Sequence, residues 1–483
     1  MEFSTLIFEP HVDLKLPPVP VPFIDVVFSE IQKIDLVDPL STSAPLPFAI
    51  SSLIQSEVVS GRLLTRGDDV KETFELSLDI KEAFSYLPGD SVGIFAQNSL
   101  EEVDQLLKCL GLHDQKNSPI EIVVKSGVKK KLPLYLPPVS TPKIVLESVL
   151  EIRGVMKKGF LRSLAEYTAD SKEKRRLLEL SSQEGAAEYN KYFLQQGWTL
   201  SDVLTELRSC VPPLPLLLEQ LPRLLPRAYS IASAPSSGEN KINIVFNLVV
   251  TPRGKPGVCS SWLKNKCENF DDLSKKFEKM GIEDSSTNFS SKTIPLFFRK
   301  PSNFRIPSPM DAPLILIGPG TGVAPFVGFI EHISLQEKNI SDGLKDTILV
   351  YFGCRYRNRD HIYKEEMEDF VSRKFISEYR VCHSRDRLQE SDPKYVQDLL
   401  YVDKENVCDL ITRGAFVFVC GDATNMAKDV QAILVKILHE CSDMTADGAE
   451  QLISQLEKNG KFVKDVWRCL DETIRLYVDR FDF

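Results

Sequence analysis

A glycine-rich turn is the clearest chemical signal in this sequence. It reads GPGTGVAPF over residues 318–326, directly after the apolar run LILI at 314–317. Glycines let a backbone turn tightly beside a phosphate, and a helix that starts there offers unpaired N–H groups and the positive end of its dipole. The placement between a buried strand and a helix predicts a pyrophosphate-binding turn, with Gly320, Thr321 and Gly322 as its contact residues.

A second group of polar residues indicates which dinucleotide the turn would hold. The turn is not the GxGxxG fingerprint, and no acidic residue ends the next strand to accept a ribose 2′-hydroxyl. Instead a later apolar run leads into Ser384 and Arg385, and Lys394, Tyr395 and Gln397 follow shortly after. An arginine beside a hydroxyl suits a 2′-phosphate, so NADPH is favoured over NADH. Taken alone, the Ser-Arg pair would favour a solvated loop.

The elements that must position these residues alternate between strands and helices. Apolar runs at 314–318, 347–354, 378–384 and 415–421 read as buried parallel strands, with helical stretches between them and a long helix over 423–440. This texture predicts an α/β doubly wound domain over residues 309–467.

Upstream, the texture is that of an antiparallel β-barrel. Short alternating runs, TFELSLDI and SVGIFAQ, flank the structural turn LPGD, and β texture returns in 227–233, INIVFNLVV and TIPLFFRK. We expect the barrel in two parts, 46–135 and 221–308, with a helix at 100–110 and a helical insertion over 136–220. A polar excursion is expected at 264–291. Alternating prolines in LPPVPVPF predict a linker without a core over residues 1–45, and 468–483 reads as a tail.

Composition excludes several classes of function. A net charge of −9 argues against a surface built for nucleic acid. No apolar run approaches the ~20 residues that span a bilayer, so no membrane segment is expected. The ten cysteines form no CxxC pair, which favours reduced thiols and a cytoplasmic protein. The six histidines show no metal-ligand spacing, so we expect no metal.

Several motifs resemble the ferredoxin-NADP reductase superfamily, and within it the diflavin reductases. They are GPGTGVAPF, FGCR at 352–355, SRD with KYVQ, and VCGDATNMA at 419–427, in the family's order over the last third of the chain. The resemblance implies a ferredoxin-NADP reductase-like fold that binds FAD and NADPH. Residues implied in NADPH binding are Arg299, Gly320, Thr321, Gly322, Ser384, Arg385, Lys394, Tyr395, Val396, Gln397 and Asp429.

Two upstream segments resemble the flavin-binding part of that family. In RAYS at 227–230 the resemblance places Arg227 on the FAD pyrophosphate, Tyr229 against the ring system and Ser230 near N5, with Ala228 between them. Guanidinium pairs well with phosphate, and an aromatic face packs on a flavin. The segment GVCS resembles the family's pyrophosphate loop, in which backbone amides and a serine hydroxyl hold the diphosphate; its residues are Gly257, Val258, Cys259 and Ser260.

The resemblance also implies a mechanism of hydride transfer from NADPH to FAD. Ser230 would steady N5, Cys420 would lie near the nicotinamide, and Asp465 would balance the developing positive charge. Trp467, in the KDVW segment, would stack on the flavin and move aside. Without that family context, Cys420 reads as strand packing and Trp467 as a core anchor.

Within the family, the insertion GFLRSLAEYTADSKEKRRLLEL is similar to the branch that reactivates cobalamin-dependent methionine synthase. The resemblance implies methionine synthase as a partner and a role in methionine biosynthesis. Because residues 1–45 are too short for a flavodoxin module, FMN is expected only on a separate or missing flavodoxin-type domain. Two alternatives stay open: a truncated FAD- and NADPH-binding scaffold without full electron transfer, or the reductase half of an NADPH-haemoprotein reductase.

Overall fold

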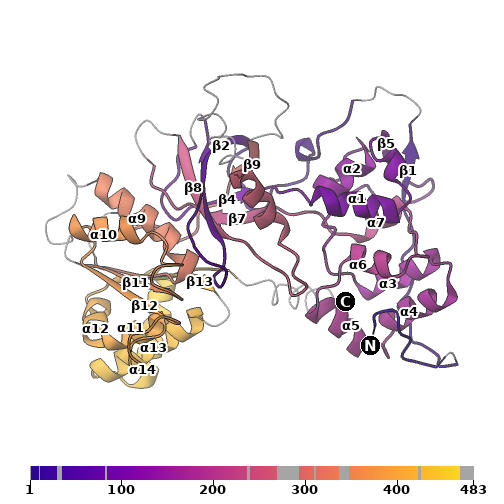
Figure 1. Ribbon diagram of the computed structural model, residues 1–483. Helices are drawn as coiled ribbons and strands as arrows, with labels where there is room; N and C mark the ends of the chain where they lie inside the picture. The colour runs from indigo at the N-terminus through magenta and orange to yellow at the C-terminus, as the bar shows by residue number, and fades with distance from the viewer. Residues whose placement is uncertain are drawn as a thin grey trace.

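The fold was obtained as a computed structural model, and it consists of three units side by side (Figure 1). The structure describes residues 2–9, 11–29, 35–81, 84–235, 240–268, 293–308, 310, 312–336, 347–422 and 426–467. A barrel lies between a helical unit and a parallel α/β unit (Figure 1). The predicted tail at 468–483 and most of the predicted excursion at 264–291 fall outside the described residues.

The central unit is a six-stranded antiparallel barrel. Its strands run in the order β7-β4-β9-β2-β3-β8, and every neighbouring pair is antiparallel. A bridge between Ile231 and Ile244 joins the two end strands and closes the sheet. The bounds are β2 Ile54–Leu63, β3 Thr73–Asp79, β4 Ser91–Ile94, β7 Arg227–Ser230, β8 Lys241–Asn247 and β9 Thr293–Phe298.

The turn that precedes β4 is structural, as its sequence predicts. Gly89 has φ +90°, and a Cβ there would lie 1.7 Å from the carbonyl oxygen of Phe304, so only glycine fits. The carboxylate of Asp90 accepts the backbone N–H of Leu87 at 2.9 Å. Both of its oxygens also accept hydrogen bonds from Arg305, at 2.8 and 2.7 Å. The turn therefore fixes the start of β4 against the segment that leads to the α/β unit.

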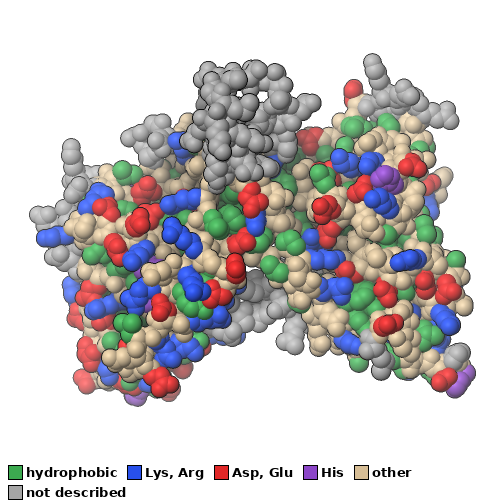
Figure 2. Space-filling view, viewed as in Figure 1, with side chains coloured by type: hydrophobic (Ala, Val, Ile, Leu, Met, Phe, Trp, Pro, Cys, Tyr) green, Lys and Arg blue, Asp and Glu red, His purple; other side chains and the backbone are tan. Residues whose placement is uncertain are grey.

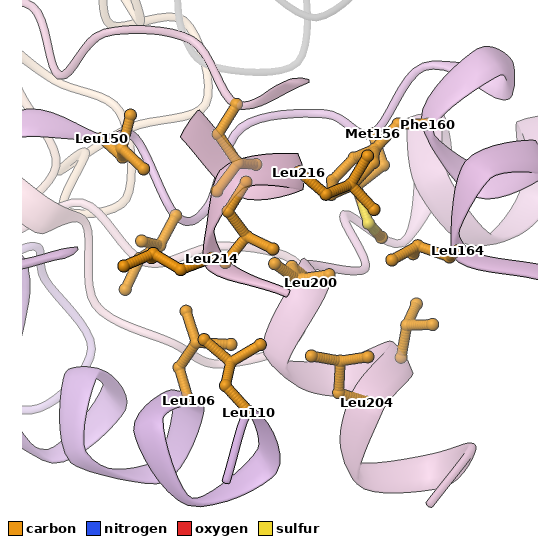
Figure 3. Packing of buried hydrophobic residues seen from close by; sticks show 14 of the residues in the cluster. Leu106, Leu110, Leu150, Met156, Phe160, Leu164, Leu200, Leu204, Leu214 and Leu216 are labelled. Carbon is orange, nitrogen blue, oxygen red and sulfur yellow. The ribbon is translucent and has the colours of Figure 1, made fainter. Parts of the chain in front are cut away.

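The helical unit is a tight insertion with its own apolar core (Figure 3). Figure 3 shows leucines from separate helices pointing toward one another, with Met156 and Phe160 beside Leu216 and Leu164. Helix α1 (Leu100–Cys109) joins this core through Leu106 and Leu107. The other helices are η2 His113–Gln115, α2 Pro142–Ile144, η3 Val145–Val149, α3 Lys158–Leu164, η4 Ala165–Tyr167, α4 Ser171–Ser181, α5 Ala186–Tyr189, η5 Asn190–Gln195, α6 Leu200–Glu206 and α7 Leu214–Gln220.

The amino-terminal segment differs from the predicted linker. Strand β1 (Ile24–Phe28) pairs antiparallel with β5 (Ile120–Val124), which also pairs with β6 (Val139–Ser140). Phe3 is buried and stacks on Trp198 at 4.0 Å between ring centroids. The buried Arg176 donates to the carbonyl oxygen of Phe3 at 2.5 Å. Phe3 and Ile24 thus lie in the apolar core of the helical unit, because pairing with a strand almost a hundred residues away overrides the local proline pattern.

The third unit is a five-stranded parallel sheet in the order β12-β11-β10-β13-β14. Its strands are β10 Leu314–Ile317, β11 Ile348–Cys354, β12 Glu378–His383, β13 Phe416–Asp422 and β14 Phe462–Trp467. The four predicted strands are confirmed, whereas β14 was not anticipated. The chain moves outward from β10 to β12 and then returns to the other side of β10. The topological switch point therefore lies between β10 and β13, where such sheets bind ligands.

Helices cover both faces of this sheet. Helices α9 (Ala324–Leu335) and α10 (Lys364–Ser372) pack on one face through Phe326, Phe329 and Met367. The other face carries α11 Val396–Val402, α12 Lys404–Thr412, α13 Met426–Cys441 and α14 Ala446–Lys458. None of the helices in the described ranges has the length and apolarity needed to cross a bilayer. On the face drawn in Figure 2, acidic and basic side chains are interspersed over the described surface.

Candidate functional site

The glycine-rich turn stands at the switch point and is built from bare backbone. A Cβ on Gly318 would lie 2.4 Å from the carbonyl oxygen of Gly322, and one on Gly322 would lie 2.1 Å from that of Cys420. Gly320 has φ +55° and faces open space. The turn enters a short 3₁₀ helix, Gly320–Val323, and then α9. These are the features of a phosphate cradle, so the residues present fit the pyrophosphate of a dinucleotide.

The barrel and the α/β unit meet at a hydrogen bond between two predicted catalytic residues. The hydroxyl of Ser230, at the end of β7, donates to Oδ2 of Asp465 in β14 at 2.6 Å. The two residues are 235 positions apart in sequence. Burial raises the pKa of Asp465 above its ordinary value, although the hydrogen bond from Ser230 and the charge of Arg299 act in the opposite sense. A carboxylate held in this way can respond to charge that develops beside it.

Cys420 is the neighbour of Asp465 in the parallel pairing of β13 with β14. It is fully buried, and burial followed by the field of Asp465 raises the pKa of its thiol well above the ordinary value. Cys420 is therefore a neutral thiol rather than a nucleophilic thiolate. Its carbonyl oxygen abuts Gly322, so the thiol-bearing strand end and the glycine-rich turn are in direct contact.

Arg299 lies beside this group, at the end of β9. Its guanidinium donates to the hydroxyl of Ser91 at 3.4 Å and stands 5.6 Å from the ring centre of Phe48. Ser91 is the register partner of Ser230 in the β4–β7 pair, which explains the proximity of the two serines. Sequence reasoning missed Ser91, whose only signal was its position just after the LPGD turn. Arg299 is therefore held near Ser230 through Ser91, and its charge acts on Asp465.

The predicted flavin segment forms strand β7, and its side chains contact different partners. The guanidinium of Arg227 is ion-paired with Glu151 of the helical unit at 2.8 Å, while its side chain stays 43% exposed. Ala228 is also exposed. The hydroxyl of Tyr229 contacts Sγ of Cys259 at 3.1 Å. Burial raises the pKa of Tyr229 well above its ordinary value and that of Cys259 to about 11, so both are neutral.

The predicted pyrophosphate loop ends in a helix over residues 258–268. A Cβ on Gly257 would come within 3.0 Å of Oγ of Ser260, so the loop is closely wound. The hydroxyl of Ser260 accepts the backbone N–H of Val249 at 3.1 Å and donates to the carbonyl oxygen of Gly257 at 3.3 Å. This hydroxyl therefore closes the loop itself. The first N–H groups of the helix, from Val258 onward, are left to bind phosphate, which fits a diphosphate-bearing flavin.

The predicted 2′-phosphate residues lie between β12 and α11. The backbone N–H of Ser384 donates to the carbonyl oxygen of Cys354 at 2.8 Å, and the Arg385 side chain is exposed. The N–H groups of Lys394 and Tyr395 donate to the carboxylate of Asp398 at 3.0 and 2.9 Å, which caps α11. Exposed cations at this edge can meet a phosphate from solvent.

The remaining predicted cofactor residues fall into three settings. Val396 is buried and Gln397 half-buried at the start of α11, and Asp429 is exposed in the first turn of α13. Thr321 accepts a hydrogen bond from Asn247 of the barrel at 3.3 Å, which ties the glycine-rich turn to β8. Trp467 ends β14 and pairs with Asp422 through the backbone, but its side chain lies outside what the structure describes.

A group that sequence reasoning did not anticipate stands at the same sheet edge. Cys354, His361 and His383 each offer a ligand atom, and these atoms lie within 4.8 Å of one another. Their spacing along the chain matches no metal motif, so only the fold reveals the group.

Two cofactor-binding domain families match the chain. The FAD binding domain matches residues 46–262, and the oxidoreductase NAD-binding domain matches residues 316–432. The first match covers the barrel strands up to β8 together with the insertion, and the second covers most of the parallel sheet, from the end of β10 to the start of α13. They define the class: an oxidoreductase with an FAD-binding barrel and an NAD(P)-binding α/β domain.

Curated relatives narrow the class to one family. The chain is 36% identical to methionine synthase reductase of Rattus norvegicus over 442 residues, which cover 88% of this chain and 62% of the relative. It is 36% identical to methionine synthase reductase of Homo sapiens, covering 84% and 59%. It is also 32% identical to NADPH–cytochrome P450 reductase of Dictyostelium discoideum, covering 91% and 62%. The chain therefore belongs to the diflavin reductases, and it spans about six tenths of the length of these relatives.

This membership confirms the fold class and the FAD and NADPH cofactors that the sequence predicts.

Proposed function

We propose that this chain is the FAD- and NADPH-binding part of a reductase that passes electrons to an FMN-bearing flavodoxin-type domain or protein. The observation that carries the proposal is the 2.6 Å hydrogen bond between Ser230 and Asp465, with Cys420 beside it. It joins the flavin segment of the barrel to the end of the nucleotide sheet. When both cofactors are bound, NADPH supplies a hydride and FAD accepts it.

The chain's own residues have the following proposed roles. The amides of the 257–260 loop and Arg227 would hold the flavin pyrophosphate, which requires Arg227 to leave Glu151. The 320–322 turn would hold the dinucleotide pyrophosphate, and Ser384, Arg385 and Lys394 its 2′-phosphate. Ser230 would orient the flavin, and Asp465 would stabilise positive charge on the nicotinamide side. Trp467 would shield the flavin until nicotinamide enters.

For the partner, we propose cobalamin-dependent methionine synthase as the final electron acceptor, and a place in methionine biosynthesis in the cytoplasm. The support is the higher identity to relatives named methionine synthase reductase, 36% against 32% for the relative named for cytochrome P450. We also propose a division of the chain in which residues 2–28 belong to the helical insertion rather than to a linker.

The test is anaerobic stopped-flow mixing of the FAD-loaded chain with NADPH, followed by addition of the isolated flavodoxin domain of a methionine synthase reductase. We expect fast bleaching of the flavin absorbance and then its recovery when that domain is added. Bleaching without recovery, together with reduction of a haem protein acceptor, would favour the haemoprotein reductase alternative. Bound FAD that NADPH fails to bleach would leave a cofactor-binding scaffold and overturn the proposal.

A further inference from the structure

The group formed by Cys354, His361 and His383 has a topological origin. Cys354 is the last residue of β11 and His383 the last residue of β12, and the two are register partners in the parallel pair. Parallel neighbours at the carboxyl edge of a sheet are held a fixed distance apart by the ladder. His361 lies just before α10, whose first residue is Lys364. One ligand atom from each of the three residues lies within 4.8 Å of the other two.

Two imidazole nitrogens in this group have unmet hydrogen-bonding capacity. Among the described residues, neither Nδ1 of His361 nor Nε2 of His383 has a hydrogen-bond partner, and both atoms are buried. His383 as a whole residue is only 9% exposed. A buried polar nitrogen without a partner costs stability, so a ligand that satisfies both nitrogens is expected.

The surroundings hold the His361 ring in an orientation that leaves Nδ1 facing the group. Its Nε2 lies 2.9 Å from the hydroxyl of Tyr379. Its ring stacks on Phe352 with centroids 5.0 Å apart. Metal-binding histidines commonly engage their second nitrogen with such a partner, which fixes the ring and leaves the other nitrogen for the ion. Here the nitrogen left over is the unpartnered Nδ1.

An ion that binds Cys354 must displace the thiol proton to solvent, because the thiolate is the form that ligates a metal. This requires a metal with strong affinity for sulfur.

An opening to solvent exists on one side of the group. A cavity of about 410 Å³ is lined by both histidines, Tyr379 and the charged residues Arg357, Lys364 and Glu368. It provides an entry path and space for a fourth ligand. Zn–N and Zn–S bonds of about 2.0–2.3 Å bring ligand atoms to roughly 3.5–4 Å of one another, so the three residues need to close by about 1 Å.

We propose that Cys354, His361 and His383 form a binding site for a thiophilic divalent metal ion of the Zn²⁺ class, with a fourth position open to water. Two histidines and one thiolate are a ligand set that zinc accepts. The proposal does not rest on the proposed function, because the metal site requires neither FAD nor NADPH. His383 immediately precedes Ser384, a predicted NADPH-binding residue.

The test uses the full chain with FAD bound, freed of metal by a chelator and then titrated with Co²⁺. We expect one equivalent to bind, with a thiolate-to-cobalt charge-transfer absorption that stoichiometric Zn²⁺ abolishes. Cys354→Ser should remove this absorption, and Cys354→Ser or His383→Phe should weaken Zn²⁺ at least tenfold in competition with a chromophoric chelator. The flavin spectrum checks that each variant is folded.

Matched controls distinguish this site from chance binding. Cys382→Ser changes a buried thiol that contacts the carbonyl oxygen of Phe352 at 3.7 Å and lies outside the group. His439→Phe changes an exposed histidine. Both should bind Co²⁺ and Zn²⁺ like the unchanged chain. A wild-type chain that binds no stoichiometric metal would overturn the proposal without reference to any variant, as would binding that Cys354→Ser leaves unchanged.

Discussion

At the scale of single residues, the site depends on a buried carboxylate whose pKa is set by a few neighbours. Burial raises the pKa of Asp465, and the Ser230 hydrogen bond opposes that rise. Replacing Ser230 with alanine removes a donor that favours the charged form, so the pKa of Asp465 should rise further. We expect the acid limb of the NADPH oxidation profile to move to higher pH in Ser230→Ala, and the rate at neutral pH to fall about tenfold or more.

The measurement is the rate of NADPH-dependent ferricyanide reduction by the FAD-loaded chain between pH 5 and 9. Ser77→Ala, on β3 of the same barrel, is the control and should keep the unchanged profile. A Ser230→Ala variant slowed equally at every pH would show that the serine does not act through Asp465.

From residue types alone, the site residues could be predicted only where a family motif is present in the sequence. The glycine-rich turn is evident in the sequence because only glycine lets the backbone approach a phosphate closely. In the structure a Cβ on Gly322 would lie 2.1 Å from the carbonyl oxygen of Cys420. The proximity of Ser230 to Asp465, and of Cys354 to His383, is different in kind. The first contact arises from the docking of the barrel on the parallel sheet and the second from the register of β11 with β12, and no local sequence pattern encodes either. The partners of Arg299 were likewise not predicted from the sequence. In the structure its guanidinium contacts Ser91 and Phe48.

At the scale of elements, strands with a continuous apolar sequence were the easiest to predict. Strands β10, β11 and β13 bury nearly every residue, so their apolar runs are clear in the sequence. Strand β14 reads FVKDVW, in which Lys464 and Asp465 interrupt the run, because it is an edge strand that pairs only with β13. Strand β1 was hidden by nearby prolines and gains its stability from β5.

A second prediction concerns how the helical unit supports the flavin loop. Asp202 caps α6 through Thr199 and accepts a hydrogen bond from Lys255 at 2.8 Å, in the segment that leads to the 257–260 loop. Burial alone would raise the pKa of Asp202, but the hydrogen bonds from Lys255 and Thr199 outweigh it and lower the pKa. Asp202→Ala should destabilise the chain by about 1–3 kcal/mol and weaken FAD binding.

The pH dependence of that loss follows from the sign of the shift. A folded pKa below the unfolded value of about 4 gives stability that is fully present above pH 4 and disappears as pH falls through the folded pKa. Thermal unfolding should therefore show a constant gap between Asp202→Ala and the unchanged chain from pH 6 to 8, narrowing only in acid. Asp114→Ala, whose carboxylate is fully exposed, is the matched control. If Asp202→Ala is less stable but binds FAD with unaltered affinity, Asp202 caps α6 but does not support the 257–260 loop.

At the scale of the whole molecule, the active arrangement exists only because two units are docked. Side-chain contacts across the boundary include Arg62 with Glu366 at 2.9 Å and the N–H of Ala234 with Glu331 at 2.7 Å. The exposed ion pair between Arg62 and Glu366 contributes little by itself. A close backbone approach lies at Gly328 in α9, where a Cβ would lie 3.2 Å from backbone atoms of Ala232 and Ser233. These residues follow β7, which carries Ser230, so this glycine sets how closely the barrel approaches the nucleotide sheet.

Gly328→Val should therefore push the end of β7 away from α9 and lengthen the Ser230–Asp465 contact. A misplacement near 1 Å can cost about a hundredfold in rate. We expect NADPH-dependent flavin bleaching in stopped-flow to slow at least tenfold, while FAD content and NADP⁺ affinity by calorimetry stay within twofold, because each cradle lies inside one unit. Gly159→Val is the control: Gly159 is also helical, with open space around its Cβ, and it should bleach at the normal rate. If Gly328→Val instead bleaches normally, the units approach each other by a motion that this contact does not limit, and the site is assembled by domain movement rather than by fixed docking.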